Sequence, residues 1–260
     1  MARTKRRAAR WAVLLGVVSV LSGCSFLAPA EQEPLDLAVP DFPSETVWTR
    51  EEGEGPPYES ELRCRLEPDG TLFCWFEPWS DWAFLWDLWG ADLDQCPISY
   101  EPVVLMKDVV QVDVCTNHLI CLKADGTVWT FGYNSYGQLG TGTEQDMVLE
   151  PVRVLEDCVA VDTDWCVSAA LGKNGDLYTW GDNRKGVLGD GQSGYQEPID
   201  PSWQNPVHKK ALTPAVVLSD ITAMSFETDD KGRLNGRAVD RFGVVYLWGE
   251  SYGPTPEASE

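Results

Sequence analysis

The sequence is poor in the residues that most catalytic and metal sites need. It has only two histidines, and it contains no nucleophile-elbow, zinc-protease, phosphate-loop or zinc-spaced Cys/His motif. Acidic pairs such as Asp162/Asp164 and Asp229/Asp230 have the chemistry for acid–base catalysis or calcium binding. Acids in solvated loops are the simpler interpretation, because the chain has 41 acidic residues. We therefore expect no catalytic residue, no metal and no cofactor, and we expect that the protein is not an enzyme.

Basic residues are scarce after the first 23 positions. Residues 1–23 contain five Lys and Arg and no acid, so the remainder has 15 basic residues against 41 acidic ones. A body this acidic repels phosphate backbones, and no basic stripe offsets the repulsion. The composition predicts that nucleic acid is not a partner.

The sequence has no apolar run long enough to span a bilayer comfortably, which needs about 20 residues. The basic start is followed by the apolar run Trp11–Leu21, as in a secretory signal peptide. The run ends in Leu-Ser-Gly-Cys at 21–24, which resembles the lipobox of bacterial lipoproteins. This resemblance implies a signal peptide at 1–23, acylation of Cys24 and an extracytoplasmic, membrane-anchored protein. The alternative is a signal peptide with an incidental cysteine.

The segment 24–60 that follows is rich in Pro, Glu and Ser and has little apolar periodicity. Such a composition favours a flexible tether between the lipid and the folded body.

A hairpin-like pattern then occurs four times. Each copy has apolar residues, a polar turn that closes on glycine, an alternation of apolar and polar residues, and an aromatic residue. The copies are Cys64–Phe76, Cys121–Gly132, Leu171–Gly181 and Ala238–Gly249, with turn glycines Gly70, Gly126, Gly175 and Gly243. The repeat predicts strands joined by turns in which glycine adopts a positive φ.

A second element, G-x-N-x-x-G-x-L-G-x-G, follows the two middle hairpins. Its four glycines are Gly132, Gly137, Gly140 and Gly142 in one copy and Gly181, Gly186, Gly189 and Gly191 in the other, and Gly249 closes the fourth hairpin. Together with the hairpins, this element resembles the repeat of the regulator of chromosome condensation family, over residues 61–253. The resemblance implies an all-β propeller with four-stranded blades, and it gives His118 a structural role.

The copies depart from the family pattern in several places. The known family members have seven blades, whereas about four are visible here, which leaves a small closed ring, an open arc or an assembly with partners. Thr46–Thr49 resembles Thr127–Thr130, so one interpretation is a strand that pairs with the last blade and closes the sheet. Residues 254–260 are expected to form a tail.

A tryptophan cluster interrupts the first copy. Trp75, Trp79, Trp82, Trp86 and Trp89 are spaced as on one face of a helix. The spacing predicts a short helical insertion, whose aromatic stripe either packs on the blades or forms an exposed binding platform. We take Trp79, Trp82, Trp86 and Trp89 as a candidate binding surface.

Seven cysteines remain after Cys24, a number that leaves at least one unpaired within the chain. If Pro68–Gly70 is a three-residue loop, Cys64 and Cys74 lie directly opposite each other, at a pair that can be bridged. We therefore predict a Cys64–Cys74 disulfide in exported protein.

The function that these features favour is binding. We expect a surface lipoprotein whose propeller loops bind a protein or a cell-wall ligand. The alternatives are an extracellular enzyme, or enzyme subunit, that acts on cell-wall glycans, and a purely structural repeat array. The family's founding member is a nucleotide-exchange factor that binds chromatin, and neither role follows from the fold alone.

Overall fold

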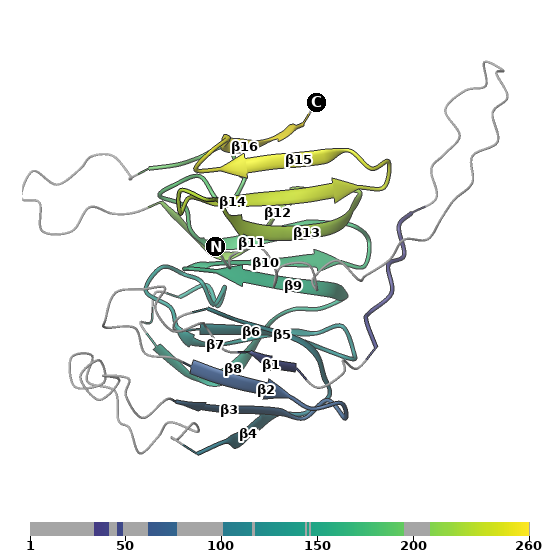
Figure 1. Ribbon diagram of the computed structural model, residues 1–260, viewed down its shortest axis with the longest axis vertical. Helices are drawn as coiled ribbons and strands as arrows, with labels where there is room; N and C mark the ends of the chain where they lie inside the picture. The colour runs from purple at the N-terminus through teal and green to yellow at the C-terminus, as the bar shows by residue number, and fades with distance from the viewer. Residues whose placement is uncertain are drawn as a thin grey trace, which may run out of the picture.

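The computed structural model describes residues 34–41, 46–48, 62–76, 101–115, 118–143, 145, 147–194 and 209–259. Over these residues the chain forms sixteen strands and no helix, and hence no helix that could cross a membrane. The strands form four four-stranded antiparallel sheets, which we number as blades 1 to 4 (Figure 1). The all-β propeller-like architecture expected from the sequence is confirmed.

In each blade, the four strands follow one another in chain order. Blade 1 comprises β1 (Thr46–Trp48), β2 (Leu62–Leu66), β3 (Leu72–Phe76) and β4 (Val103–Met106). Blade 2 comprises β5 (Val109–Cys115), β6 (His118–Lys123), β7 (Val128–Tyr133) and β8 (Met147–Leu155). Blade 3 comprises β9 (Cys158–Asp164), β10 (Val167–Gly172), β11 (Leu177–Asp182) and β12 (Lys210–Leu218). Blade 4 comprises β13 (Ile221–Thr228), β14 (Leu234–Asp240), β15 (Val245–Gly249) and β16 (Gly253–Ala258).

The central hairpin of each blade turns at the predicted glycine. The φ angles of Gly126 and Gly175 are +82° and +85°, a region that side chains with a Cβ rarely adopt. The Asp125 carboxylate accepts the Thr127 N–H at 3.0 Å, which stabilises the same turn from the other side. The hairpin prediction is therefore confirmed in position and in backbone conformation.

In the first three blades, the carbonyl of the turn glycine also accepts a hydrogen bond from the next blade. In three successive junctions it accepts the N–H of the first residue of the following blade at 2.9 Å, in the pairs Gly70–Val109, Gly126–Cys158 and Gly175–Ile221. A short turn therefore fixes both its own hairpin and the position of the neighbouring sheet.

The hydrophobic core is divided between the three junctions. Between blades 2 and 3, for example, Ile120, Leu122 and Val128 pack with Val161 and Trp180, and all five are almost fully buried. Burial of this apolar area stabilises each pair of sheets, by roughly 25 cal/mol per Å² removed from water. Each blade is thus held mainly by its neighbours.

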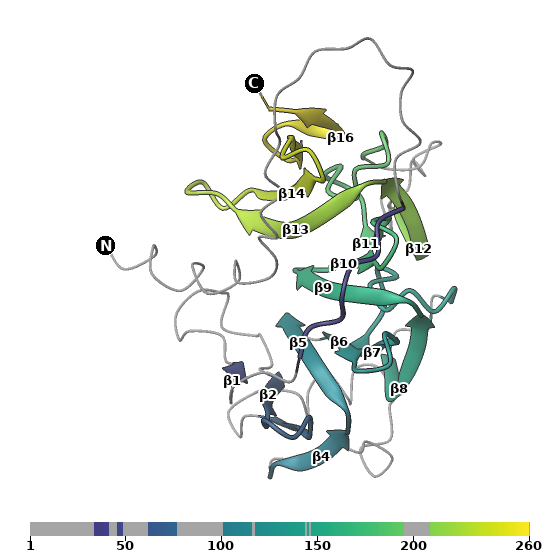
Figure 2. The same ribbon diagram turned by 90° about the vertical axis from the view of Figure 1, so that its right-hand side faces the viewer.

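The four blades form an open arc. They stack along the longest axis, so blade 1 and blade 4 lie at opposite ends (Figure 1). The first strands β1, β5, β9 and β13 follow one side of the stack, and the fourth strands follow the other (Figure 2). Of the alternatives left open by the sequence, the described residues therefore form an arc, not a small closed ring.

Two strand assignments differ from expectation. Thr46–Trp48 does form a strand, but it pairs antiparallel with β2 of the first blade, not with the last blade. Residues 254–260 were expected to be a tail, yet Gly253–Ala258 is β16 and pairs with β15. In both cases a blade needs a fourth strand to pair its exposed edge, and a nearby segment with weak sequence signals supplies it.

The segment expected to be a tether at 24–60 has two docked parts, which are β1 in blade 1 and residues 34–41. Residues 34–41 lie extended against the body, with Leu37 and Val39 packed on the core between the blades. The Leu37 N–H donates to the carbonyl of Lys173 at 2.9 Å. We call residues 34–41 the strap. Trp75, the first residue of the predicted helical stripe, lies in β3 and pairs with Arg63, so that part of the helix prediction is wrong. The signal peptide, Cys24, Trp79, Trp82, Trp86 and Trp89 lie outside the described residues, so those expectations stay predictions.

Candidate binding face

The two loops of like sequence after β7 and β11 have a structural role. Asn134 accepts the Leu139 N–H at 3.0 Å and donates to the Thr143 carbonyl, which closes the loop on itself. Asn183 repeats the first contact with the Leu188 N–H at 3.2 Å. The motif therefore specifies a loop whose asparagine amides are engaged by the loop itself.

Each of these loops receives a tryptophan of the next blade. The Trp180 Nε1–H donates to the Gln138 carbonyl at 2.9 Å, and the Trp248 Nε1–H donates to the Val187 carbonyl at 2.7 Å. A Cβ at Gly140 would lie 2.8 Å from Trp180 Nε1, so glycine is required there by close approach. The aromatic residue that ends each repeat is thus the anchor between blades.

His118 is structural, as the resemblance implied. It is fully buried, and its Nε2 contacts the hydroxyls of Thr163 at 2.8 Å and Ser168 at 3.3 Å in blade 3. Burial lowers the pKa of His118 to about 3. The side chain is therefore neutral at physiological pH and cross-links two blades.

Asp162 was expected in a solvated loop, and that expectation is wrong. It lies in β9, is 6% exposed, and accepts the Phe226 N–H of blade 4 at 2.6 Å. Asp113 makes the equivalent contact with the Thr163 N–H at 2.9 Å. A carboxylate on the first strand of one blade therefore satisfies a backbone donor of the next, which explains the buried acid without catalysis or calcium.

The blades present two faces at the ends of their strands. One face, the hairpin face, carries the glycine turns. The opposite face, the loop face, carries the long loops and the turns between the first and second strands. On the loop face, aromatic and paired charged side chains of blades 2 to 4 form a continuous group that we call the loop-face band. Its members are Tyr136, Trp165, Asp182, Arg184, Lys185, Asp229, Arg233, Glu250, Ser251 and Tyr252.

Trp165 is the most unusual residue of the band. It is 56% exposed and occupies the first position of the two-residue turn between β9 and β10, with φ at +51°. Glycine is the preferred residue at such a position, and a bulky side chain there carries strain of about 1–3 kcal/mol. The fold thus holds a large indole in solvent although its backbone conformation is unfavourable.

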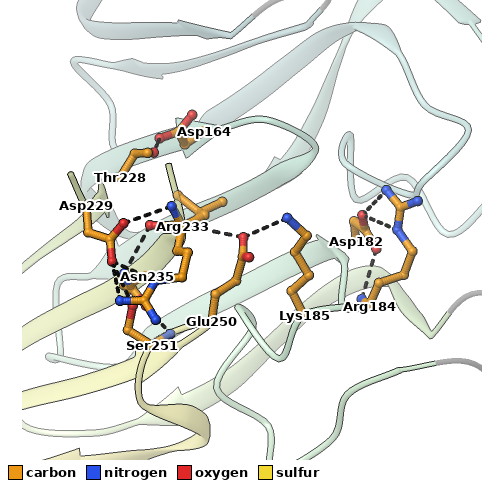
Figure 3. A network of polar contacts seen from close by, with 11 residues as sticks. Asp164, Asp182, Arg184, Lys185, Thr228, Asp229, Arg233, Asn235, Glu250 and Ser251 are labelled. Carbon is orange, nitrogen blue, oxygen red and sulfur yellow. Dashed lines mark hydrogen bonds and ion pairs between the residues drawn. The ribbon is translucent and has the colours of Figure 1, made fainter. Parts of the chain in front are cut away.

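The charged members of the band are fixed in pairs. Asp229 contacts Arg233 at 2.7 Å and accepts the Ser251 hydroxyl at 3.0 Å (Figure 3). The Arg233 N–H holds the pKa of Asp229 well below its usual range, with further help from the Arg233 guanidinium. Of the Asp229/Asp230 pair, Asp229 is therefore already engaged by Arg233 and Ser251. Asp230 is exposed.

A second set of pairs connects blades 3 and 4. Lys185 donates to Glu250 at 2.9 Å (Figure 3). The Lys185 ammonium also lies 5.9 Å from the centre of the Trp165 ring. Arg184 contacts Asp182 at 2.7 Å and stacks over the Tyr136 ring at 4.7 Å. The hydrogen bond with Asp182 raises the pKa of Arg184, so this cation stays charged. These contacts hold the charged side chains of the band in defined positions.

The cysteine register agrees with the sequence prediction. Cys64 and Cys74 are direct partners in the β2–β3 pairing, and the Glu67 N–H bonds to the Thr71 carbonyl around the three-residue loop. Both residues are fully buried, and their Sγ atoms lie 2.8 Å apart as thiols. The loop and the register are confirmed, and the disulfide itself stays a prediction.

The described residues contain no group of three or more His, Cys, Asp or Glu side chains that could hold a metal ion. An open cleft of about 890 Å³ lies on the hairpin face between the strap and blades 2 and 3. Its cations are paired, Lys173 with Asp36 and Arg153 with Glu156. The cleft therefore has no unengaged charge from these residues to direct a substrate.

The sequence did not single out Trp165. The available signal was the dipeptide Trp-Cys between two strands, at a turn where Gly or Asn is usual. Detecting it required knowledge of the exact strand ends, which the alternation of residues does not provide. The sequence directed attention to Trp79, Trp82, Trp86 and Trp89 instead, and these lie outside the described residues.

Comparison with known protein families supports the repeat assignment. Models of the regulator of chromosome condensation (RCC1) repeat match residues 125–173 and 109–138. A search of curated proteins finds no match.

Solved structures with the same fold are RCC1 propellers. The crystal structure of Prp20p from Saccharomyces cerevisiae has a TM-score of 0.56 and 18% identity, and covers 85% of this chain and 52% of its own. Yeast RCC1 (Prp20) bound to Kap60 has a TM-score of 0.55 and 16% identity, and the match covers 85% of this chain and 50% of that one. Human WBSCR16 has a TM-score of 0.52 and 18% identity, and the match covers 77% of this chain and 49% of that one. The chain thus spans about half the length of these proteins, and at such identities the likeness shows the fold alone. Residues 109–173 thus match RCC1 repeats, and the four blades have the fold of RCC1-type β-propeller structures.

Proposed function

We propose that this protein is a non-enzymatic, extracytoplasmic lipoprotein that binds a protein partner through the loop-face band. The observation that carries the proposal is Trp165, an exposed indole retained in a strained turn. Strained residues persist where the surrounding structure enforces them, and they cluster at functional sites. The described fold does not require an indole at this position, because glycine would suit the β9–β10 turn better.

The composition of the band favours a protein over other ligands. Trp, Tyr and Arg are the residues most enriched at the energetic centres of protein interfaces. Trp165 and Tyr252 are 56% and 52% exposed, and Arg184 stacks on Tyr136 in the same band. Prp20p, which shares the fold, is described as binding Gsp1p and histones. That supports protein binding as the kind of role, and it does not transfer those partners to this acidic chain.

Membrane attachment of the proposed binder depends on Cys24. Acylation should keep the full-length chain in the detergent phase on phase separation. Cys24→Ala should move it to the aqueous phase, because the remaining sequence has no apolar run of bilayer length. A Cys24→Ala chain that stays in the detergent phase would show that the lipobox interpretation is wrong.

The test of the binding face uses a photo-crosslinking amino acid at Trp165 and, as a matched control, at Phe242. Both are exposed aromatic residues in turns, but Phe242 lies on the hairpin face. In native envelopes, crosslinked protein species should form from position 165 and not from position 242. Crosslinks from both positions alike, or binding to purified glycans with no protein species, would contradict the proposal.

Trp165→Gly separates binding from folding. Removing the indole should weaken crosslinking of a second probe at Tyr252, while relief of the turn strain keeps the melting temperature at or above that of the parent. A melting temperature that falls together with binding would indicate that Trp165 serves the fold.

A further inference from the structure

The strap enters the body on the hairpin face. Leu37 donates to the Lys173 carbonyl, Asp36 forms an ion pair with the Lys173 ammonium at 3.2 Å, and Leu35 lies over Gly175. Lys173 and Gly175 both belong to the turn between β10 and β11. In Figure 1 the strap lies on the same side of the stack as this turn, to the right, away from the turn at Trp165.

Only nine residues separate Cys24 from Pro34, the first residue of the strap. A flexible chain of that length has a root-mean-square span of about 17 Å, and its fully extended length is about 35 Å. The strand β9 has seven residues, which alone extend about 23 Å at the usual rise per residue. The usual reach of the tether is therefore shorter than the distance between the two faces.

We infer that the strap orients the acylated protein, with the hairpin face toward the bilayer and the loop-face band away from it. The inference rests on the acylation of Cys24 in the proposed function. A lipid held at Cys24 keeps the Lys173 turn close to the membrane surface, because the strap is docked and the connecting segment is short. Trp165 then projects into the aqueous space, where a protein partner has access to it.

A second observation on the hairpin face agrees with this orientation. Three of the four hairpin turns carry Asp69, Asp125 or Asn174, whose side chains bond to their own turns. The fourth turn has Phe242 at this position, and it is 66% exposed. Asp240 replaces the missing contact by accepting the N–H groups of Phe242 at 2.8 Å and Val244 at 2.9 Å.

Because Asp240 stabilises the turn, residue 242 is free of a structural role. An exposed aromatic side chain on the face nearest the lipid suits the apolar side of a membrane interface.

The test compares two donor fluorophores on blade 4 of the full-length acylated protein. A fluorescent amino acid replaces Phe242 on the hairpin face or Asp230 on the loop face, and both positions are exposed. The protein is reconstituted into vesicles of phosphatidylcholine and phosphatidylglycerol that carry an acceptor dye on the headgroups. Energy transfer should be several-fold more efficient from position 242 than from position 230. Equal transfer, or more from 230, would overturn the inference.

Two controls distinguish a failure of the orientation from a failure of the acylation at Cys24. Mass spectrometry of the N-terminal peptide and flotation with the vesicles report acylation independently of orientation. An acylated protein with equal transfer refutes the orientation alone, whereas an unmodified Cys24 refutes the proposed lipoprotein together with it.

Insertion of twenty Gly/Ser residues between Glu33 and Pro34 supplies the matched variant. The span of the tether then rises to about 30 Å, comparable to the depth of a blade. The difference between positions 242 and 230 should shrink clearly while the protein still floats with the vesicles. A difference that persists unchanged would show that the strap does not set the orientation.

Discussion

Blades 3 and 4 share one hairpin design and differ on the face that points toward the C-terminal end of the arc. In blade 3 the Gly175 carbonyl and the Asp162 carboxylate both accept backbone N–H groups of blade 4. In blade 4 the corresponding Ser225 donates to Glu227 of its own strand, and a Cβ at Gly243 would meet nothing within 4 Å. The same repeat therefore builds a junction in one place and an open sheet face in the other.

The comparison teaches that a repeat position has no fixed energetic value. Its contribution depends on whether another blade covers it, because burial and hydrogen bonding to a neighbour supply the stabilisation. Matched substitutions at equivalent positions of blades 3 and 4 measure that dependence directly.

The largest difference is expected for Leu171→Ala against Val239→Ala. Each residue lies four positions before its turn glycine, but Leu171 is 2% exposed in the core between blades 3 and 4. Its truncation should lower the free energy of unfolding by about 2–5 kcal/mol, and Val239→Ala by less than about 1.5 kcal/mol. Urea denaturation of both variants checks this. Equal losses would mean that the outer face of blade 4 is covered as tightly as a junction.

The second-largest difference in stability is expected between substitutions of the two turn glycines, Gly175 and Gly243. Gly175→Val and Gly243→Val both force a side chain into a positive φ, at a cost of about 1–2 kcal/mol. Only at Gly175 would the new Cβ lie 3.2 Å from the Ile221 carbonyl and overlap Leu35, which adds about 1–3 kcal/mol. Thermal melts should show a clearly lower midpoint for Gly175→Val. An unchanged midpoint for both would refute the turn assignment.

The first blade extends the comparison to a covalent bond. Cys64 and Cys74 occupy the positions of Ile120 and Thr130 in blade 2. In exported protein we expect them to form a disulfide that contributes at most about 2–3 kcal/mol, because the loop it closes is short. Non-reducing peptide mapping should recover both cysteines in one cross-linked species. Recovery as free thiols after export, or in other pairs, would contradict the prediction.

The carboxylate contact predicts a smaller difference between the blades. Asp162→Ala leaves the Phe226 N–H without its acceptor in a buried site, which should cost about 1–3 kcal/mol. Ser225→Ala removes only a contact within its own strand and should be nearly neutral. Chemical denaturation of the two variants gives the comparison, and a neutral Asp162→Ala would show that this bond does not hold the junction.

The smallest effect is expected from pH, at the junction of blades 2 and 3. Burial lowers the pKa of His118 to about 3, while an unfolded histidine titrates near 6.5. The unfolded state therefore binds the proton first, and stability present above pH 6.5 is lost as the pH falls toward 3. Between pH 6.5 and 5.5 the loss should be about 1 kcal/mol. His118→Asn should flatten this slope, and an identical slope in the variant would assign it to other groups.

Much of the fold was predictable from local pattern. Hairpins close where Asp125 precedes Gly126, because the turn needs a positive φ and a side-chain acceptor, and both follow from residue type. Thr46–Trp48 was expected as a strand, and only its partner was wrong, since it pairs with β2 and not with the last blade. Gly253–Ala258 was expected as a tail because its alternation is weak, and it forms β16 by pairing with the edge strand β15.

The candidate site was much less predictable than the fold. The role of Asp162 depends on a backbone donor 64 positions away in the sequence, and Trp165 and Lys185 approach each other only across two turns of blade 3. No local pattern encodes such distances.

The sequence by itself determined the repeat, the position of its turns, the acidic charge of the body and the facing pair Cys64 and Cys74. These depend on residue type and on spacing within one hairpin, which local geometry controls. Only the tertiary structure decided that the blades form an open arc, that the strap docks on the hairpin face and that Trp165 is exposed on the other. Those features arise from packing between segments far apart in the chain, where burial and close approach select one arrangement among many that the local pattern allows.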